Sequence, residues 1–145
     1  MAGFDLREIE FRSDGVSDSL TSSMSPALFH ENLKREISTA DREGRELTIV
    51  SVLVDPENYL SAGEYQESLV ALAFALEKNL RGGDFFARVS DCGFWILLRT
   101  EEVSAQGVID RLDLPRRDEL TIKLAARKLS NYGEWIERID QLHFN

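Results

Sequence analysis

The sequence is poor in the residues that build disulfides, metal sites and membrane spans. It has one cysteine, Cys92, so no internal disulfide can form, which suits a reducing compartment. The two histidines, His30 and His143, show no metal-ligand spacing such as HExxH. The longest apolar runs, LVALAFAL and FWILL, are too short to cross a bilayer, and the first residues lack the pattern of a secretory signal. We therefore expect a cytoplasmic protein without membrane insertion and with no required cofactor.

Positive charge is also scarce. The 17 Lys and Arg residues face 26 Asp and Glu residues, which gives a formal net charge of −9. A general nucleic-acid binder usually carries a basic face that neutralises phosphates, so this composition argues against nucleic acid as a partner. Most of the basic residues are arginines, which recognise planar anions through paired hydrogen bonds better than lysines do. Any anionic ligand must be held by a few well-placed arginines.

The 145 residues, 43% of them hydrophobic, suit one domain with a sizeable core. We expect residues 1–17 to form a flexible lead-in and residues 18–145 to form the domain. Apolar periodicity predicts helices over 25–43, 64–80, 101–114 and 135–142, with a loop at 115–118. Runs of β-branched and aliphatic residues predict strands over 46–55, 84–89, 94–99 and 119–129.

This order of elements indicates an α/β (α+β) protein with a single mixed sheet covered by helices. The strand over 46–55 has the composition of a central strand that is buried on both faces. Trp95 and Phe94 are expected to pack the core, as are Phe74, Phe85 and Phe86 in part. Trp135 is expected to dock its helix.

Four segments occur in an order and at a spacing that are typical of one family. DSLT begins at Asp18, LTIVSVLVDPENY carries Asp55, Glu57 and Tyr59, SLVALAFAL follows, and DFFARVSDCGFWILL begins at Asp84. They resemble the DxLT, DxDxF, LxxxAxxL and DxxARxGGDEFxxLL motifs of the GGDEF (diguanylate cyclase) domain. The resemblance covers most of the chain from Asp18 onward and is weakest toward the C-terminus. It implies a central mixed, mainly antiparallel sheet flanked by helices, as in nucleotidyl cyclases.

The stretch GGDFF, which begins at Gly82, is one letter away from the family signature but stands in the wrong register. The signature forms the tip of a hairpin, so one strand must enter it and another must leave it. GGDFF follows a predicted helix, whereas SDCGF lies between two predicted strands. The resemblance therefore assigns the degenerate signature to Ser90, Asp91, Cys92, Gly93 and Phe94.

The departures from the family predict a domain without cyclase activity. Resemblance implies two carboxylates that hold Mg²⁺ against the phosphates of GTP, and Asp55 stands at the first position while Gly93 replaces the second. Ser90 and Asp91 replace a glycine pair and bring bulk and negative charge to the place where phosphates would lie. The family motif that supplies an Asn and an Asp for guanine is shortened by six residues between Tyr59 and Leu69, so the resemblance implies that these ligands are absent. We expect no metal site beyond a vestigial Asp55.

Arg81 and Asp84 form an RxxD pattern followed by five residues and then Ser90. In some members of the family this spacing marks an inhibitory or sensory site for cyclic di-GMP. The chemistry suits guanine, because a guanidinium can donate to O6 and N7 while a carboxylate can accept from N1–H and the exocyclic amine. Arg111 resembles a third arginine that completes this site in some members, in the same chain or in a partner.

Simpler interpretations stay open for each residue. Arg81 and Asp84 could form a surface ion pair that caps the turn. Arg88 could be a structural residue of the AR motif rather than a ligand, Asp55 could cap a turn, and Cys92 could be incidental at an exposed hairpin tip.

The sequence thus predicts a catalytically inactive GGDEF-like receptor for cyclic di-GMP. It would act through Arg81, Asp84 and Arg111 on an unidentified signalling partner, with a homodimer as one arrangement. The alternatives are an interaction scaffold that does not bind nucleotide and a residual GTP-binding regulator.

Overall fold

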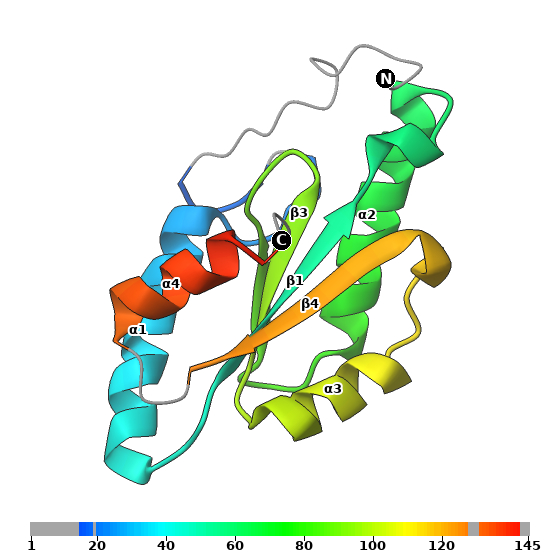
Figure 1. The fold of residues 1–145 in the computed structure, drawn as a ribbon. Coiled ribbons are helices and arrows are strands. Elements are labelled where there is room, and N and C mark those ends of the chain that lie inside the picture. Colours follow the sequence, from blue (N-terminus) through cyan, green and yellow to red (C-terminus); the bar gives the residue numbers. More distant parts are fainter. Residues whose placement is uncertain (1–14, 19, 128–130, 143–145) are drawn as a thin grey trace.

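A buried strand, β1 (Thr48–Val54), lies at the centre of the protein in this computed structural model, which describes residues 15–18, 20–127 and 131–142. All but one of its seven side chains are buried, as its β-branched and aliphatic composition predicted. The elements follow one another along the chain as α1 (Pro26–Glu43), β1, a 3₁₀ turn (Pro56–Asn58), α2 (Ala62–Asn79), β2 (Phe85–Arg88), β3 (Gly93–Leu98), α3 (Glu102–Arg111), a 3₁₀ turn (Arg117–Glu119), β4 (Leu120–Ala126) and α4 (Tyr132–Asp140) (Figure 1).

The four named strands form one sheet in the order β2-β3-β1-β4. Every strand pair is antiparallel, with Thr48 opposite Leu98 in one pair and Ala126 in the other. The expectation of a mainly antiparallel sheet is therefore confirmed, and no two of the named strands pair in parallel. The only parallel pairing in the described part of the chain is an isolated bridge between Met24 and Ala87. From β1 to β4 the connectivity is the βαββαβ arrangement of ferredoxin-like sheets.

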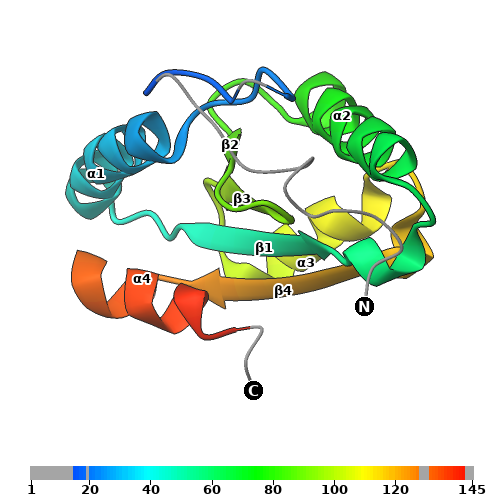
Figure 2. The same ribbon diagram turned by 90° about the horizontal axis from the view of Figure 1, so that it is seen from above.

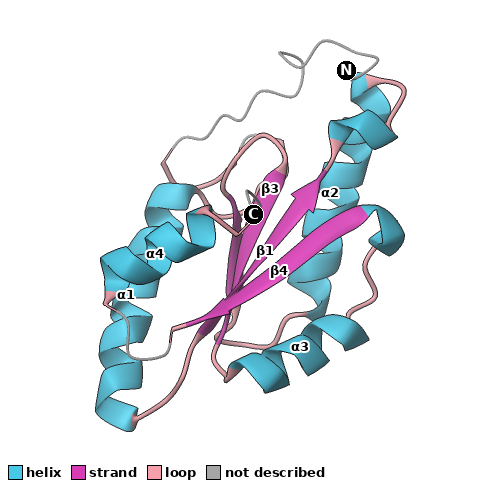
Figure 3. Ribbon diagram, in the orientation of Figure 1, coloured by secondary structure: helices cyan, strands magenta, loops and turns pink. Residues whose placement is uncertain are grey.

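Helices cover both faces of the sheet (Figures 2 and 3). Residues of α2 and α3 share one apolar core with Val50, Val52 and Ile96. Residues of α1 and α4 share a second core on the opposite face with Ile49 and Leu97. This alternation along β1 is the two-residue side-chain period of a strand, so the sheet separates two cores. None of the described helices is long and apolar enough to pass through a membrane.

Side-chain caps set the starts of α1, α2 and α4, whereas α3 (Glu102–Arg111) has no side-chain cap and is shorter than the predicted 101–114. The Ser25 hydroxyl accepts from the Leu28 N–H at 3.2 Å, and Gly44 ends α1 with φ of 66°. The Ser61 hydroxyl accepts from the Glu64 N–H, so α2 begins two residues earlier than predicted. Asn131 caps α4 in the same way, which moves its start from the predicted Trp135 to Tyr132.

Several other expectations were corrected by packing. Phe74 is 69% exposed on the outer side of α2, although it was expected to pack the core in part. The loop predicted at 115–118 runs into a 3₁₀ turn. Strand β4 ends at Ala126, and the last two residues of the strand predicted over 119–129 lie outside the described residues. Residues 1–14 of the predicted lead-in lie outside the described residues, whereas Ser17 pairs with Met24 in a β-bridge. Trp135 docks α4 as expected, because it is buried and its indole N–H donates to the Ala125 carbonyl.

Candidate functional site

The hairpin between β2 and β3 carries the SDCGF segment at its tip. Arg88 pairs with Phe94 across the hairpin, and the Val89 N–H donates to the Gly93 carbonyl at 2.9 Å. Ser90 and Asp91 are exposed, while Gly93 and Phe94 are buried. The glycines of GGDFF instead lie in the turn between α2 and β2, where Gly83 adopts φ of 98°. SDCGF therefore lies at the hairpin tip and GGDFF lies before the hairpin, as the order of the predicted elements indicated.

The hairpin tip does not fit a divalent cation. A Cβ at Gly93 would lie 2.8 Å from the Ser90 hydroxyl and 3.2 Å from the Leu53 side chain. The tip therefore leaves little room for a larger side chain at this position. The Asp55 carboxylate accepts from the Glu57 N–H at 2.9 Å and caps the turn after β1. In the described part of the chain, no three His, Cys, Asp or Glu side chains group closely enough to hold a metal ion. With Gly93 in place of the second carboxylate of the family, Asp55 offers a poor site for Mg²⁺, which needs several oxygen ligands.

Beneath the tip lies a buried ion pair between Arg88 and Asp18. The Arg88 Nη1 is 3.1 Å from the Asp18 Oδ1, and Nη2 donates to the Asp91 carbonyl at 2.8 Å. Asp18 also accepts from the N–H and the hydroxyl of Thr21. The structural interpretation of Arg88 is thus confirmed, because this residue ties the hairpin to the segment before α1.

Cys92 is half-buried rather than exposed, which corrects the expectation for this residue. Burial raises the pKa of its thiol, and the nearby Asp91 and Asp55 charges raise it further. The neighbouring Tyr65 donates its hydroxyl to the Val54 carbonyl at 2.5 Å. Because the thiolate is the nucleophile, a raised pKa lowers the reactive fraction of Cys92 at neutral pH, which favours the incidental interpretation of this residue.

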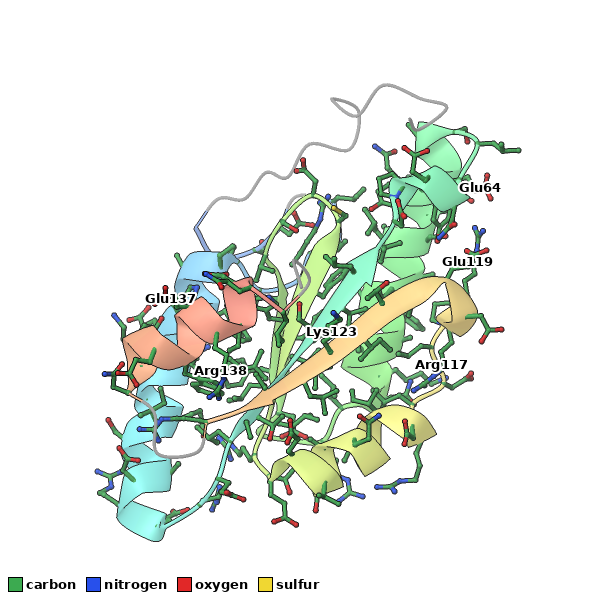
Figure 4. All side chains as sticks on the ribbon, in the orientation of Figure 1. Glu64, Arg117, Glu119, Lys123, Glu137 and Arg138 are labelled. Atoms are coloured by element: carbon green, nitrogen blue, oxygen red, sulfur yellow. The ribbon has the colours of Figure 1, made fainter. Side chains whose placement is uncertain are left out.

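The connection between β1 and α2, where the family motif is shortened, is covered by Arg116. Its guanidinium lies 4.1 Å from the centre of the Tyr59 ring and forms ion pairs with Glu64 at 3.2 Å and Glu119 at 2.6 Å. Figure 4 shows Glu64 and Glu119 at the same end of the molecule. The two carboxylates and the ring hold this guanidinium in place, so its contacts stabilise the connection between β1 and α2.

A second region brings together the two residues of the RxxD pattern and the third arginine that the resemblance assigned to the same site. A hollow of about 560 Å³ is lined by Arg81 and Asp84 from the α2-β2 turn, Arg99 after β3, and Arg111 at the end of α3. We call it the arginine hollow. Its lining also includes Ser104 and Gly107 of α3. Its three arginines stand out in a chain with a net charge of −9.

Asp84 is held by the backbone rather than by Arg81. Its Oδ1 accepts from the Arg99 N–H at 3.2 Å, and its own N–H closes the turn on the Arg81 carbonyl at 3.1 Å. Burial raises the pKa of Asp84 from its ordinary value, while the Arg99 N–H and the charges of Arg99 and Arg81 oppose this rise. The surface ion pair considered for Arg81 and Asp84 is not formed.

The guanidinium groups of Arg81 and Arg111 form no hydrogen bond or ion pair with any residue that the structure describes. Arg111 folds back over Gly107, where an added Cβ would lie 3.1 Å from its Nη1. Arg99 was missed by the sequence reasoning, although its place directly after the buried run FWILL was a signal that its side chain leaves the sheet near Asp84.

A larger hollow of about 800 Å³ runs along the outer side of α2 and is lined in part by Leu20, Val70 and Phe74. We call it the α2 hollow. Its charged lining residues are Glu67 and Asp113, and it includes no Lys or Arg. This lining suits an apolar surface of a partner rather than an anionic ligand.

Comparison of the sequence with family models and with curated proteins finds no significant match. Solved structures do match. The GGDEF domain of DgcB from Caulobacter crescentus, solved in complex with c-di-GMP, aligns with a TM-score of 0.75 at 17% identity over 92% of this chain and 90% of that one. The GGDEF domain of YfiN (TpbB) from Pseudomonas aeruginosa aligns with a TM-score of 0.62 at 25% identity, over 78% and 76%.

The chain has the GGDEF fold. A third match is the diguanylate cyclase SiaD from Pseudomonas aeruginosa, solved with its activator SiaC, with a TM-score of 0.69 at 22% identity. This chain covers 55% of SiaD and is itself covered over 86% of its length. The helix-flanked antiparallel sheet predicted by the resemblance is thereby confirmed as the GGDEF fold.

Proposed function

We propose that this GGDEF-fold protein binds cyclic di-GMP in the arginine hollow and does not synthesise it. The observation that carries the proposal is the convergence of Arg81, Asp84 and Arg111 on one hollow, although Arg111 lies 27 positions after Asp84 in the sequence. Bound ligand would alter the surface offered by the α2-β2 turn and α3. A protein partner, or a second copy of the chain, would read that change.

The contacts within the hollow suit a guanine base. The backbone of Arg99 fixes the Asp84 carboxylate, which can still accept from guanine N1–H and the exocyclic amine. Arg81 stands three residues away and has no competing partner among the described residues, so its guanidinium is available for O6 and N7. Arg111 offers a second uncommitted positive charge for a phosphate.

The comparison with DgcB supports the choice of ligand, because that GGDEF domain was solved in complex with c-di-GMP. Two further solved complexes of GGDEF domains with c-di-GMP align with this chain at a TM-score of 0.74. The fold is thus one on which this dinucleotide binds in other proteins.

The hairpin tip supports the absence of synthesis. Gly93 offers no carboxylate, and Asp55 is occupied as a cap. Incubation with GTP and either Mg²⁺ or Mn²⁺ should therefore yield no cyclic di-GMP. Detectable product would overturn this part of the proposal.

Isothermal titration with cyclic di-GMP tests binding directly. We expect the wild type to bind and Arg81→Ala to lose at least about tenfold in affinity, which is the effect of one charge-assisted hydrogen-bonding group. Arg35→Ala is the matched control, because Arg35 is an exposed arginine on α1 that pairs with Glu31 away from the hollow. Absence of heat with the wild type at micromolar ligand, or undiminished binding by Arg81→Ala, would overturn the proposal.

One observation favours a nucleotide-independent scaffold as the second candidate. The α2 hollow presents Phe74 at 69% exposure and Val70 at 42%, and exposed apolar patches often mark interaction surfaces. If a partner is captured equally with and without cyclic di-GMP, and titration shows no nucleotide binding, the scaffold is the better description. A parallel titration with GTP distinguishes the residual GTP-binding regulator, which should give heat with GTP and none with cyclic di-GMP.

A further inference from the structure

Arg99 is one of the three arginines that line the arginine hollow. It directly follows β3, and its N–H donates to the Asp84 Oδ1 at 3.2 Å. Asp84, to which it donates, lines the same hollow. No motif singled it out, because an arginine after a strand has no distinctive spacing.

The Arg99 guanidinium is held in place from two sides. Its Nη2 donates to the Glu36 carboxylate of α1, which is 16% exposed. Its Nη1 lies against the turn at Gly83, where an added Cβ would come within 2.5 Å of it. Gly83 therefore leaves the room that this guanidinium occupies.

The charges leave the hollow with a positive excess. Three arginines stand against Asp84 and Glu36, so the group carries one net positive charge when all five are ionised. Glu36 engages one nitrogen of Arg99, and a guanidinium has five N–H donors. The remaining donors of Arg99 can bind an anion without breaking the ion pair with Glu36.

We infer that Arg99 is an anion-binding residue of the arginine hollow, which Glu36 holds ready for a phosphate of the ligand. This inference rests on the proposed function and extends it. Arg81 and Asp84 recognise one guanine, while Arg111 and Arg99 each meet one of the two phosphates of the cyclic dinucleotide. The Glu36 contact fixes a long side chain before binding and so lowers the entropy lost when the phosphate binds.

The test is a titration of cyclic di-GMP into the wild type, Arg99→Ala, Arg99→Lys and Arg35→Ala, each at low and moderate salt. Arg99→Ala should weaken binding at least about tenfold and make the affinity less sensitive to salt, because one charge-charge contact is gone. Arg99→Lys should lie between the wild type and Arg99→Ala, since an ammonium keeps the charge and loses the fork geometry. Arg35→Ala should match the wild type.

The outcomes separate this inference from the proposed function. Absence of binding by the wild type overturns both. Binding that Arg81→Ala weakens and Arg99→Ala leaves intact, with the same salt dependence, overturns the role of Arg99 alone. A purely structural role for Arg99 predicts lower affinity with unchanged salt dependence and no rescue by lysine, and this result would also overturn the inference. Thermal unfolding of each variant shows whether it is folded. If Arg99→Ala does not fold, the affinity and salt dependence of Arg99→Lys test the role of Arg99 instead.

Discussion

The Nη1 of Arg88 lies 3.1 Å from the Oδ1 of Asp18, and solvent reaches neither side chain. Two buried charges that stabilise each other cannot be separated cheaply, because removal of one leaves the other without compensation. The pair joins the last residue of β2 to the segment that leads into α1, and Arg88 also binds the Asp91 carbonyl at the hairpin tip. The positions of the tip and of this segment are therefore linked.

Arg88→Met should lower the free energy of unfolding by about 3–5 kcal/mol, because it leaves the Asp18 carboxylate buried without a counter-charge, with only the Thr21 donors as partners among the described residues. Urea denaturation followed by circular dichroism measures the change. Arg35→Ala is again the control, since its ion pair with Glu31 is largely exposed and should contribute little. A loss below about 1 kcal/mol in Arg88→Met would mean that the pair is not a major stabilising contact.

Gly83→Ala should destabilise the protein by about 1–2 kcal/mol, because Gly83 has φ of 98° and an L-residue is strained there. The new methyl group would also displace the Arg99 guanidinium, so affinity for cyclic di-GMP should fall as well. Gly82→Ala is the matched control for stability, since a Cβ at Gly82 meets nothing within 4 Å. Equal melting temperatures for the two variants would contradict this account of Gly83.

Asp84→Asn should separate binding from stability. Burial raises the pKa of Asp84 in the folded protein, so the folded state holds this proton more readily than the unfolded chain. The contribution of Asp84 to stability therefore falls as the pH rises through the interval between the two pKa values, and ionised Asp84 does not stabilise the fold at neutral pH. Asparagine keeps an acceptor for the Arg99 N–H, so we expect stability to be unchanged or slightly higher.

The same substitution should weaken cyclic di-GMP binding at least about tenfold, because an amide oxygen cannot accept two guanine N–H groups as a carboxylate does. In the wild type, affinity should fall as the pH is lowered through the raised pKa of Asp84. Titrations from neutral to mildly acidic pH measure this. An affinity that is independent of pH, or an Asp84→Asn variant that binds normally, would remove Asp84 from the site.

His30 should make the protein less stable in mild acid. Its Nδ1 lies 2.5 Å from the Tyr132 hydroxyl, and burial lowers its pKa, as does Lys34, while Asp140 opposes the shift. Because the unfolded chain binds this proton at a higher pH than the folded protein, stability falls as the pH drops below about 6.5. The stability of His30→Gln should decline less over the same interval in chemical denaturation. Parallel declines for the two proteins would contradict the prediction.

Much of the fold was predictable because local patterns determined it. The β-branched run of β1 predicted a central strand, and the polar break SDCG between two apolar runs predicted the hairpin. Helix boundaries were less accurate where a cap replaced an apolar signal. At α4 the side chain of Asn131 begins the helix three residues before the first large apolar residue, Trp135.

The remaining features depend on contacts that local patterns do not report. Helix α2 is apolar over much of its circumference, so periodicity alone could not show that Phe74 faces outward while Leu72 is buried. The residues of the RxxD pattern were identifiable from spacing. Glu36 was not, because it meets Arg99 across 63 positions of sequence through the packing of α1 beside the sheet.

The segment before α1 also covers part of one edge of the sheet. It lies along β2, which is an outer strand of the sheet, through the bridge between Met24 and Ala87. The outer edge of a sheet exposes backbone donors and acceptors that can recruit a strand from another molecule. By occupying part of that edge, Met24 and its neighbours protect the protein against strand addition. A chain shortened to begin after Met24 would lose this protection and Asp18 together, and it should self-associate into β-rich aggregates sooner than the full chain.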